Sequence, residues 1–200
     1  MLSGMMKCCG TMCALGAMMF LGNLSRLEAA VTTVGFGNIT ATSALPPESG
    51  FPLSAIVDGN PGTVSSLNGF VSNTLGTISF AFDQDYNLAS FILWNDVVVN
   101  NEGINDFSLR FYDSSDVQIT VPFLANYVGP QGQVAPEEYV FASPVEFVRR
   151  VELEVISVQA PSFPTRIEIR EVDFGVVPEP SAVGLAALGG LLALRQRRRK

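Results

Sequence analysis

The stretch that decides the fold is residues 77–94, Thr-Ile-Ser-Phe-Ala-Phe-Asp-Gln-Asp-Tyr-Asn-Leu-Ala-Ser-Phe-Ile-Leu-Trp. Its first part, Thr77 to Phe82, alternates small or polar residues with large apolar ones, which is typical of a strand with one buried face. Its second part, Ser90 to Trp94, is an apolar run with the composition of a buried strand. The sequence Asp83-Gln84-Asp85 between them favours a turn. We therefore expect two successive strands here.

Similar segments recur along the chain, and we find no convincing long amphipathic helix. The further expected strands are 31–40, 107–112, 117–121, 138–141, 151–155 and 166–174. Turn signals separate them at 46–47, 58–62, 100–103, 113–116 and 129–132, and 125–136 is the expected long exposed loop. About eight short strands with this spacing predict an all-β protein, an antiparallel sandwich of jelly-roll type.

The first 30 residues have the pattern of a secretory signal peptide. Lys7 is followed by an apolar or small stretch from Cys8 to Leu21 and by Ala29-Ala30. All three cysteines lie in this segment. We therefore expect a signal helix, removed at a site that the pattern does not fix, and a mature protein without disulfides or thiolate metal sites.

The last 24 residues form a second signal. A Pro-Glu-Pro motif is followed by an apolar run of 13 residues, Ala182 to Leu194, and by a basic end. At about 1.5 Å per residue a helix of that run covers roughly 20 Å, less than the roughly 30 Å core of a bilayer. The motif residues are Val177, Pro178, Glu179 and Pro180, and the basic residues are Arg195, Arg197, Arg198, Arg199 and Lys200.

This order of parts resembles the PEP-CTERM sorting signal of Gram-negative bacteria. The resemblance implies export through the inner membrane, processing by an exosortase near the motif, and a final place at the cell surface or in the extracellular matrix. The alternative is a plain short anchor that is kept, with the basic residues holding its end on the cytoplasmic side. The chain thus divides into a signal peptide (1–30), one domain (31–176) and a sorting signal (177–200).

The charge of the chain changes once its ends are set aside. Residues 31–180 contain five arginines against 18 acidic residues, a net charge of −13, with no lysine or histidine. Such a surface repels nucleic acid and anionic lipid, and it suits divalent cations and neutral polymers. Some of this acidity could serve only solubility.

Short motifs between residues 36 and 175 narrow the fold further. They are Ala55-Ile56-Val57-Asp58-Gly59-Asn60 with Thr63, Gly76-Thr77-Ile78-Ser79-Phe80, Tyr86-Asn87-Leu88, Gly103-Ile104-Asn105-Asp106-Phe107-Ser108-Leu109 and Arg166-Ile167-Glu168-Ile169-Arg170-Glu171-Val172. In this order they resemble discoidin or F5/8 type C domains, which are galactose-binding-like jelly rolls. The family's usual tryptophan after the threonine is absent here, where Val64-Ser65-Ser66 stands.

The resemblance implies a structural calcium ion. Asp58 would supply a carboxylate, Asn60 a carbonyl, and Thr63 a hydroxyl and a carbonyl, a mixed oxygen set of the kind calcium favours. By resemblance, the carbonyls of Ala55 and Arg170 and the carboxylate of Glu171 would complete the site. The alternative is that Asp58-Gly59-Asn60 forms an ordinary turn.

Candidate ligand residues combine aromatic faces with hydrogen-bonding groups, as carbohydrate sites do. Trp94 with Asn95 ends a strand, Tyr127 and Tyr86 are further aromatic candidates, and Arg110 could bind a sugar hydroxyl. Equally, Trp94 could belong to the core, and Arg110 could pair with Asp106 or with an acid on a neighbouring strand.

These observations favour a noncatalytic, surface-sorted module that associates with exopolysaccharide or another surface glycan. One alternative is a structural envelope or biofilm-matrix protein without a soluble ligand. The other is a glycosidase, because without histidine or cysteine only paired carboxylates remain for catalysis. The available pairs are Asp83/Asp85, Asp113/Asp116 and Glu137/Glu138, all in expected turns or loops.

Overall fold

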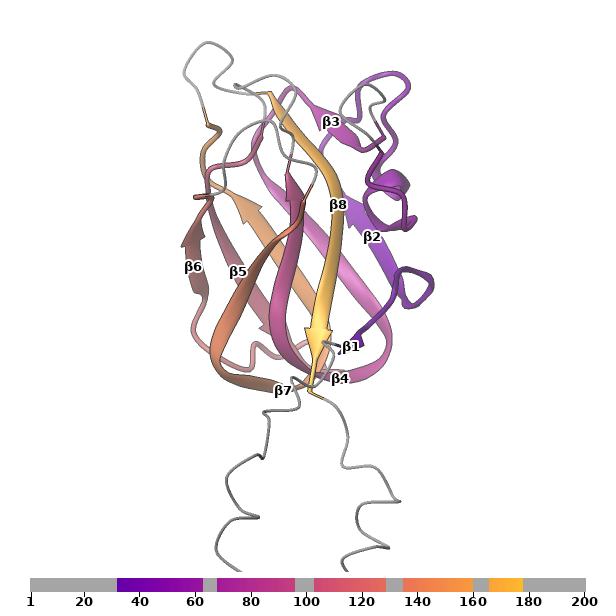
Figure 1. Cartoon of the computed structure of the whole chain (residues 1–200). Coiled ribbons are helices and arrows are strands. Elements are labelled where there is room, and N and C mark those ends of the chain that lie inside the picture. Colours follow the sequence, from indigo (N-terminus) through magenta and orange to yellow (C-terminus); the bar gives the residue numbers. More distant parts are fainter. Residues whose placement is uncertain (1–31, 63–67, 96–102, 129–134, 160–165, 178–200) are drawn as a thin grey trace, which may run out of the picture. The chain divides into compact units, whose positions relative to one another are not determined.

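The computed structural model describes residues 32–62, 68–95, 103–128, 135–159 and 166–177 (Figure 1). The expected signal peptide, the C-terminal helix and the basic end lie outside these ranges. The strands are β1 (Thr32–Thr33), β2 (Ile39–Ser43), β3 (Phe70–Ser72), β4 (Thr77–Asn95), β5 (Asp106–Tyr112), β6 (Phe123–Asn126), β7 (Glu137–Val155) and β8 (Ile167–Val176). Two short 3-10 helices, η1 (Phe36–Asn38) and η2 (Leu53–Val57), precede β3.

Two long strands, β4 and β7, build both layers of an antiparallel sandwich. The first part of β4, 77–82, pairs with β2 and with the second part of β7, which in turn pairs with β5. The second part of β4, 88–95, pairs with β8 and with the first part of β7. Register shifts between Ala81 and Ser90 mark the bend, because bulges increase the curvature of a strand. The predicted all-β sandwich is therefore confirmed.

The core between the layers is rich in aromatic side chains. Phe80 and Phe82 from one layer contact Phe174 on β8, with ring centroids 5.7 and 5.1 Å apart. Phe91 contacts Phe107 on β5 at 5.5 Å. All five rings are at least 96% buried, so the alternation seen in the sequence sorts these residues into one continuous core.

Four details of the predicted strands are wrong. The single strand expected at 31–40 is divided into β1 and the start of β2 by the 3-10 helix η1. The turn expected at 83–85 is a bend within β4, and the separate strands expected at 138–141 and 151–155 are parts of β7. A single strand can pass from one layer to the other when each of its two halves has an apolar face, because a bulge between the halves bends the strand without interrupting it. The strand expected at 117–121 is absent, and β6 begins at Phe123 instead.

The segment before β3 covers the outer face of β8. Asp173 on β8 accepts a hydrogen bond from the backbone N–H of Gly35, and Phe36 packs over Gly59, where an added Cβ would lie 2.9 Å from the ring. Gly59 also has a φ of +82°, which favours glycine. As a result β8 is buried on both faces although it carries four charged residues.

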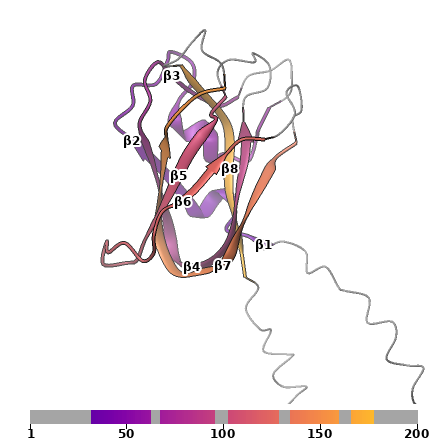
Figure 2. The same ribbon diagram turned by 90° about the vertical axis from the view of Figure 1, so that its left-hand side faces the viewer.

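The sandwich has two distinct ends (Figures 1 and 2). At the end we call the loop end, β4 stops, β5 begins, β6 stops, β7 begins and ends, and β8 begins. At the opposite end, the basal end, β4 and β7 bend, β5 connects to β6, and β1 pairs with the last residues of β8. In the part of the chain that the structure describes, no helix has the length and apolar character needed to cross a membrane.

Candidate functional site

The loop after η2 is held by two consecutive side-chain turns. The backbone N–H of Asn60 donates to Asp58 Oδ1 at 2.8 Å, and the N–H of Gly62 donates to Asn60 Oδ1 at 3.2 Å. Asx turns of this kind are the local reason that aspartate and asparagine favour such positions. They direct the Asp58 carboxylate and the Asn60 carbonyl toward a common point.

Asn68, which the sequence analysis did not select, lies at that point. Its Nδ2 donates to Asp58 Oδ1 and Oδ2 at 3.3 and 3.2 Å, and also to the carbonyl of Asn60. Three oxygens from two residues therefore converge on one amide. The opposite orientation of the same amide would place its carbonyl oxygen there instead, as a further cation ligand.

Glu171 completes this arrangement from β8. Its side chain is fully buried, and among the residues that the structure describes neither carboxylate oxygen has a hydrogen-bond partner within normal geometry. The pKa of Glu171 is raised to about 7, with burial as the largest cause. The Asp58 carboxylate raises this pKa further, and the nearby backbone N–H groups of Gly59 and Asn60 partly oppose the increase. Two neighbouring carboxylates, one of them desolvated, are costly to ionise together without a cation.

The donor set fits calcium better than a transition metal. Within the described ranges no group of three or more Asp, Glu, His or Cys side chains is placed to hold a metal, so most ligands would be carbonyl or amide oxygens. Calcium accepts such mixed oxygen sets, whereas zinc prefers nitrogen and sulfur. The orphaned oxygens of Glu171 beside Asp58 are the observation that makes the residues fit.

The other predicted calcium ligands are placed less directly. Arg170 is buried on β8, and its Nη1 donates to the carbonyl of Pro61 at 3.4 Å, which ties the loop to the strand. Ala55 is buried in η2. Thr63 lies outside the described residues.

Asn95 is engaged in the framework at the loop end. It is 3% exposed, its Nδ2 donates to the carbonyl of Ile104 at 2.7 Å, and its Oδ1 accepts from the N–H of Ile104 at 2.9 Å. The side chain thereby replaces a pair of ladder hydrogen bonds between the end of β4 and the start of β5. A ligand would have to compete with both bonds.

Trp94 and Tyr127 are half-buried at the same end. Trp94 pairs in register with Glu171 on β8, and its ring lies 6.3 Å from the ring of Phe36, which packs over Gly59. Tyr127 directly follows β6, and burial together with the Glu137 charge raises the pKa of its hydroxyl. The ring of Trp94 is thus linked through Phe36 to the loop that carries Asp58.

Arg110 lies elsewhere, on the outer face of β5. Its Nη2 donates to Glu154 Oε2 on β7 at 2.6 Å. Next to it, Arg150 stacks over the ring of Tyr112 at 3.8 Å and pairs with Asp116 and Glu152. The pairing with an acid of the neighbouring strand, one of the two possibilities seen in the sequence, is the one the structure shows.

Three acidic pairs were considered for catalysis. In the pair Asp113 and Asp116, Asp113 Oδ1 accepts from the backbone N–H of Ser115 and Asp116 Oδ1 lies 2.6 Å from Arg150. The other two pairs lie at opposite ends of the sandwich. At the basal end Asp83 accepts from the hydroxyl of Tyr86 at 2.9 Å and Asp85 lies 3.9 Å from Arg149. At the loop end Glu137 accepts from the hydroxyl of Tyr139 at 2.7 Å, and Glu138 accepts from Ser90. These contacts give each of the four carboxylates a structural partner.

Comparison with known proteins identifies two parts of the chain. Residues 176–200 match the PEP-CTERM protein-sorting motif. The motif indicates export and C-terminal processing for association with the surface, and it implies an exosortase as processing partner. No curated protein matches the sequence.

Solved structures match the domain in fold. The family 32 carbohydrate-binding module of Clostridium perfringens NanJ, solved with galactose, shares 15% identity over 72% of this chain and 97% of its own, with a TM-score of 0.57. A fucose-binding module of Streptococcus pneumoniae shares 11% identity over 76% and 100%, with a TM-score of 0.55. An F5/8 type C domain of Bacteroides fragilis shares 9% identity over 72% and 94%, with a TM-score of 0.52. The domain therefore has the discoidin-like fold of these modules.

Proposed function

We propose that this protein is a noncatalytic module that binds extracellular polysaccharide or another surface glycan after it has been sorted to the cell surface. The observation that supports the proposal most is the fold, which the chain shares with a module solved in complex with galactose and with a fucose-binding module. The sorting motif at 176–200, which indicates export, supports a site of action outside the cell. Because one fold serves many functions, carbohydrate binding also requires suitable side chains on the surface of the domain.

We place the glycan at the loop end, against Trp94 and Tyr127. Both rings are half-buried, so each is fixed by packing and still has a face or edge that a sugar ring could contact. Asn95 supports these surroundings through Ile104, whereas Arg110 lies away from them and pairs with Glu154. Neither side chain contacts the ligand in this proposal.

Calcium would act at the neighbouring loop as a structural ion. Asp58, Asn60 and Glu171 would hold it, with Asn68 as an added ligand, and the ion would neutralise the two adjacent carboxylates. Because Phe36 connects this loop to Trp94, the same residues would also fix the position of the tryptophan.

Screening of the full chain with calcium on a glycan array tests the proposal. We expect binding to a subset of glycans, with galactose and fucose as the first monosaccharides to examine. Trp94→Ala or Tyr127→Ala should weaken binding about tenfold, the loss of one good aromatic contact. Arg110→Ala is the matched control and should bind as the wild type does. Absence of binding across common glycans and exopolysaccharide would remove carbohydrate binding as the function.

Processing can be tested on the natural product. We expect mass spectrometry to find a C-terminus close to Pro180, because the sorting motif is the expected site of exosortase action. A product that keeps Lys200 would instead indicate that the tail remains as an anchor.

A further inference from the structure

The connection between β5 and β6 exposes an apolar pattern that the fold does not use. Residues Val117-Gln118-Ile119-Thr120-Val121 alternate as a half-buried strand would, yet they form no strand, and their apolar side chains face solvent. Val117 is 59% exposed and Val121 is 79% exposed. Exposed apolar side chains that cluster in this way usually mark a surface with a partner.

Phe147, at the bend of β7, joins these residues to one surface. Its ring is 64% exposed, and its φ of 58° is a backbone conformation that a bulky residue rarely adopts. The side chain of Asn87 holds this bend, with Oδ1 accepting from the N–H of Phe147 at 3.0 Å. We call Ile119, Val121 and Phe147, which line one cavity, the basal patch.

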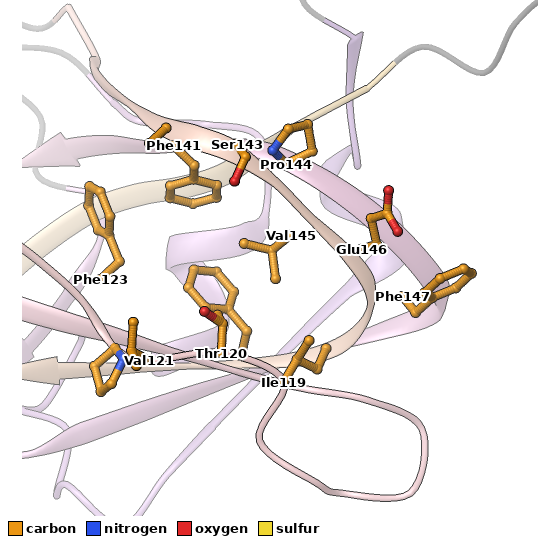
Figure 3. A pocket seen from close by; sticks show the side chains of 13 residues that line it. Ile119, Thr120, Val121, Phe123, Phe141, Ser143, Pro144, Val145, Glu146 and Phe147 are labelled. Carbon is orange, nitrogen blue, oxygen red and sulfur yellow. The ribbon is translucent and has the colours of Figure 1, made fainter.

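A cavity of about 530 Å³ opens beside the basal patch (Figure 3). Ile119 and Val121 lie along one wall, and Phe141 and Val145 lie along the facing wall, with Phe147 at the edge. The lining is therefore mostly apolar and comes from two separate parts of the chain.

The same end of the domain leads to the sorting signal. Phe147 also lines a second cavity, together with Thr32 on β1 and with Val176 and Val177 at the end of β8. Only residues 177–181 lie between β8 and the apolar run that starts at Ala182. Fully extended, five residues reach at most about 18 Å, so a tail inserted in a bilayer keeps the basal end close to the lipid.

Charge at the basal end is partly compensated. Asp116 lies 2.6 Å from Arg150, and Asp85 lies 3.9 Å from Arg149. These pairs reduce the repulsion that the domain's acidic surface would otherwise exert on lipid phosphates. The remaining acidity favours a zwitterionic surface over an anionic one.

We propose that the basal patch contacts the lipid surface while the chain is held by its C-terminal tail. Aromatic and branched apolar side chains are suited to the interface between headgroups and acyl chains. A second copy of the chain or the tail itself would fill a single groove. Side chains that project from both the β5–β6 connection and the bend of β7 at the tethered end fit an extended apolar phase better. This inference concerns the end of the domain opposite the proposed glycan site.

Tryptophan fluorescence in the full chain tests the proposal, because Trp94 is the only native tryptophan and lies at the other end. The full chain is reconstituted in phosphatidylcholine vesicles whose acyl chains are brominated. The two basal reporters are the double variants W94F/F147W and W94F/V121W. The matched control is W94F/V140W, because Val140 on β7 is 68% exposed and lies outside the basal patch.

We expect brominated lipid to quench the fluorescence of both basal reporters about twofold, and to leave the control variant and native Trp94 nearly unchanged. Equal quenching of the basal reporters and the control, or no quenching of the basal reporters in chains that float with the vesicles, would overturn the proposal. Failure of the chains to float with the vesicles would also overturn it. So would a concentration-dependent change in the fluorescence of W94F/F147W without lipid, because that change would indicate self-association. Glycan binding is scored separately, so either proposal can fail alone.

Discussion

The two ends of the sandwich, which are joined by the same two long strands β4 and β7, differ in the side chains that they expose. Toward the loop end, the buried amide of Asn95 is bound to the backbone of Ile104, and the exposed carboxylate of Asp58 accepts a hydrogen bond from the backbone N–H of Asn60. At the basal end, apolar side chains are exposed, and one of them sits in a strained conformation. The comparison teaches that polar residues near the loop end hold the fold together and surround the proposed calcium site, whereas the basal patch is better explained by a contact than by stability.

Removal of the Asn95 side chain should have the largest effect. In Asn95→Ala the N–H and the carbonyl of buried Ile104 both lose their partner, at a combined cost of about 4 kcal/mol in the free energy of unfolding. Urea denaturation measures it. The control Asn126→Ala, at an exposed position on β6, should stay within about 0.5 kcal/mol. Equal effects in the two variants would remove the structural role given to Asn95.

The pH dependence of stability should follow from Glu171. Its pKa of about 7 in the folded state lies above the ordinary value of 4.5, so the folded state binds the proton more tightly. The contribution of Glu171 to the free energy of unfolding is therefore fully present below pH 4.5 and is lost as the pH rises through 7. The loss is about 3 kcal/mol in the absence of divalent cations. Denaturant titrations between about pH 4 and pH 8 measure this. Glu171→Gln should flatten this part of the curve, and an unchanged slope would mean that Glu171 ionises normally.

Calcium should restore, at neutral pH, the free energy of unfolding that is lost when Glu171 ionises. If the ion binds only the folded state, a concentration about one hundred times the dissociation constant adds about 2.7 kcal/mol, or roughly 8 °C in Tm for a domain of this size. Differential scanning calorimetry with calcium and with a chelator measures the difference. Asp58→Ala should show no response, and an identical Tm of the wild type in both buffers would count against the site.

At the basal end, relief of backbone strain should stabilise the protein slightly. Phe147→Gly allows the positive φ without a side-chain clash and should raise the free energy of unfolding by about 1 kcal/mol. Phe147→Ala removes the ring but keeps the strain, so it should show no gain. Chemical denaturation distinguishes them. Destabilisation by Phe147→Gly would mean that the ring contributes to the fold after all.

The fold class was predictable from the sequence because its signals are local. The alternation of 77–82 and the apolar run of 90–94 required no knowledge of distant contacts, and both segments have strand conformation within β4. The continuity of β4 and β7 was missed because a bulge and a turn leave the same polar residues in the sequence. The alternation of 117–121 misled for a different reason, since a pattern specifies which residues share a face but not whether that face is buried.

The candidate site was partly predictable in the same sense. Asp58 and Asn60 follow from turn chemistry, and Glu171 was named through the resemblance to discoidin domains, but Asn68 depends on a contact across ten residues that no local pattern encodes. For Asn95 and Arg110 the residue type indicated that the side chain would form hydrogen bonds, but the sequence did not indicate with which partner. Ile104 and Glu154 become their neighbours only when β5 pairs with β7 and approaches the end of β4.

Hydrogen–deuterium exchange of the full chain most directly tests the claim that the two ends have different partners. Exchange is measured in calcium alone, with galactose, and in phosphatidylcholine vesicles. We predict that galactose slows exchange around Trp94 and Tyr127, and that vesicles slow it at 113–122 and 143–147. Protection of the basal end by galactose, or of the loop end by vesicles, would contradict the account.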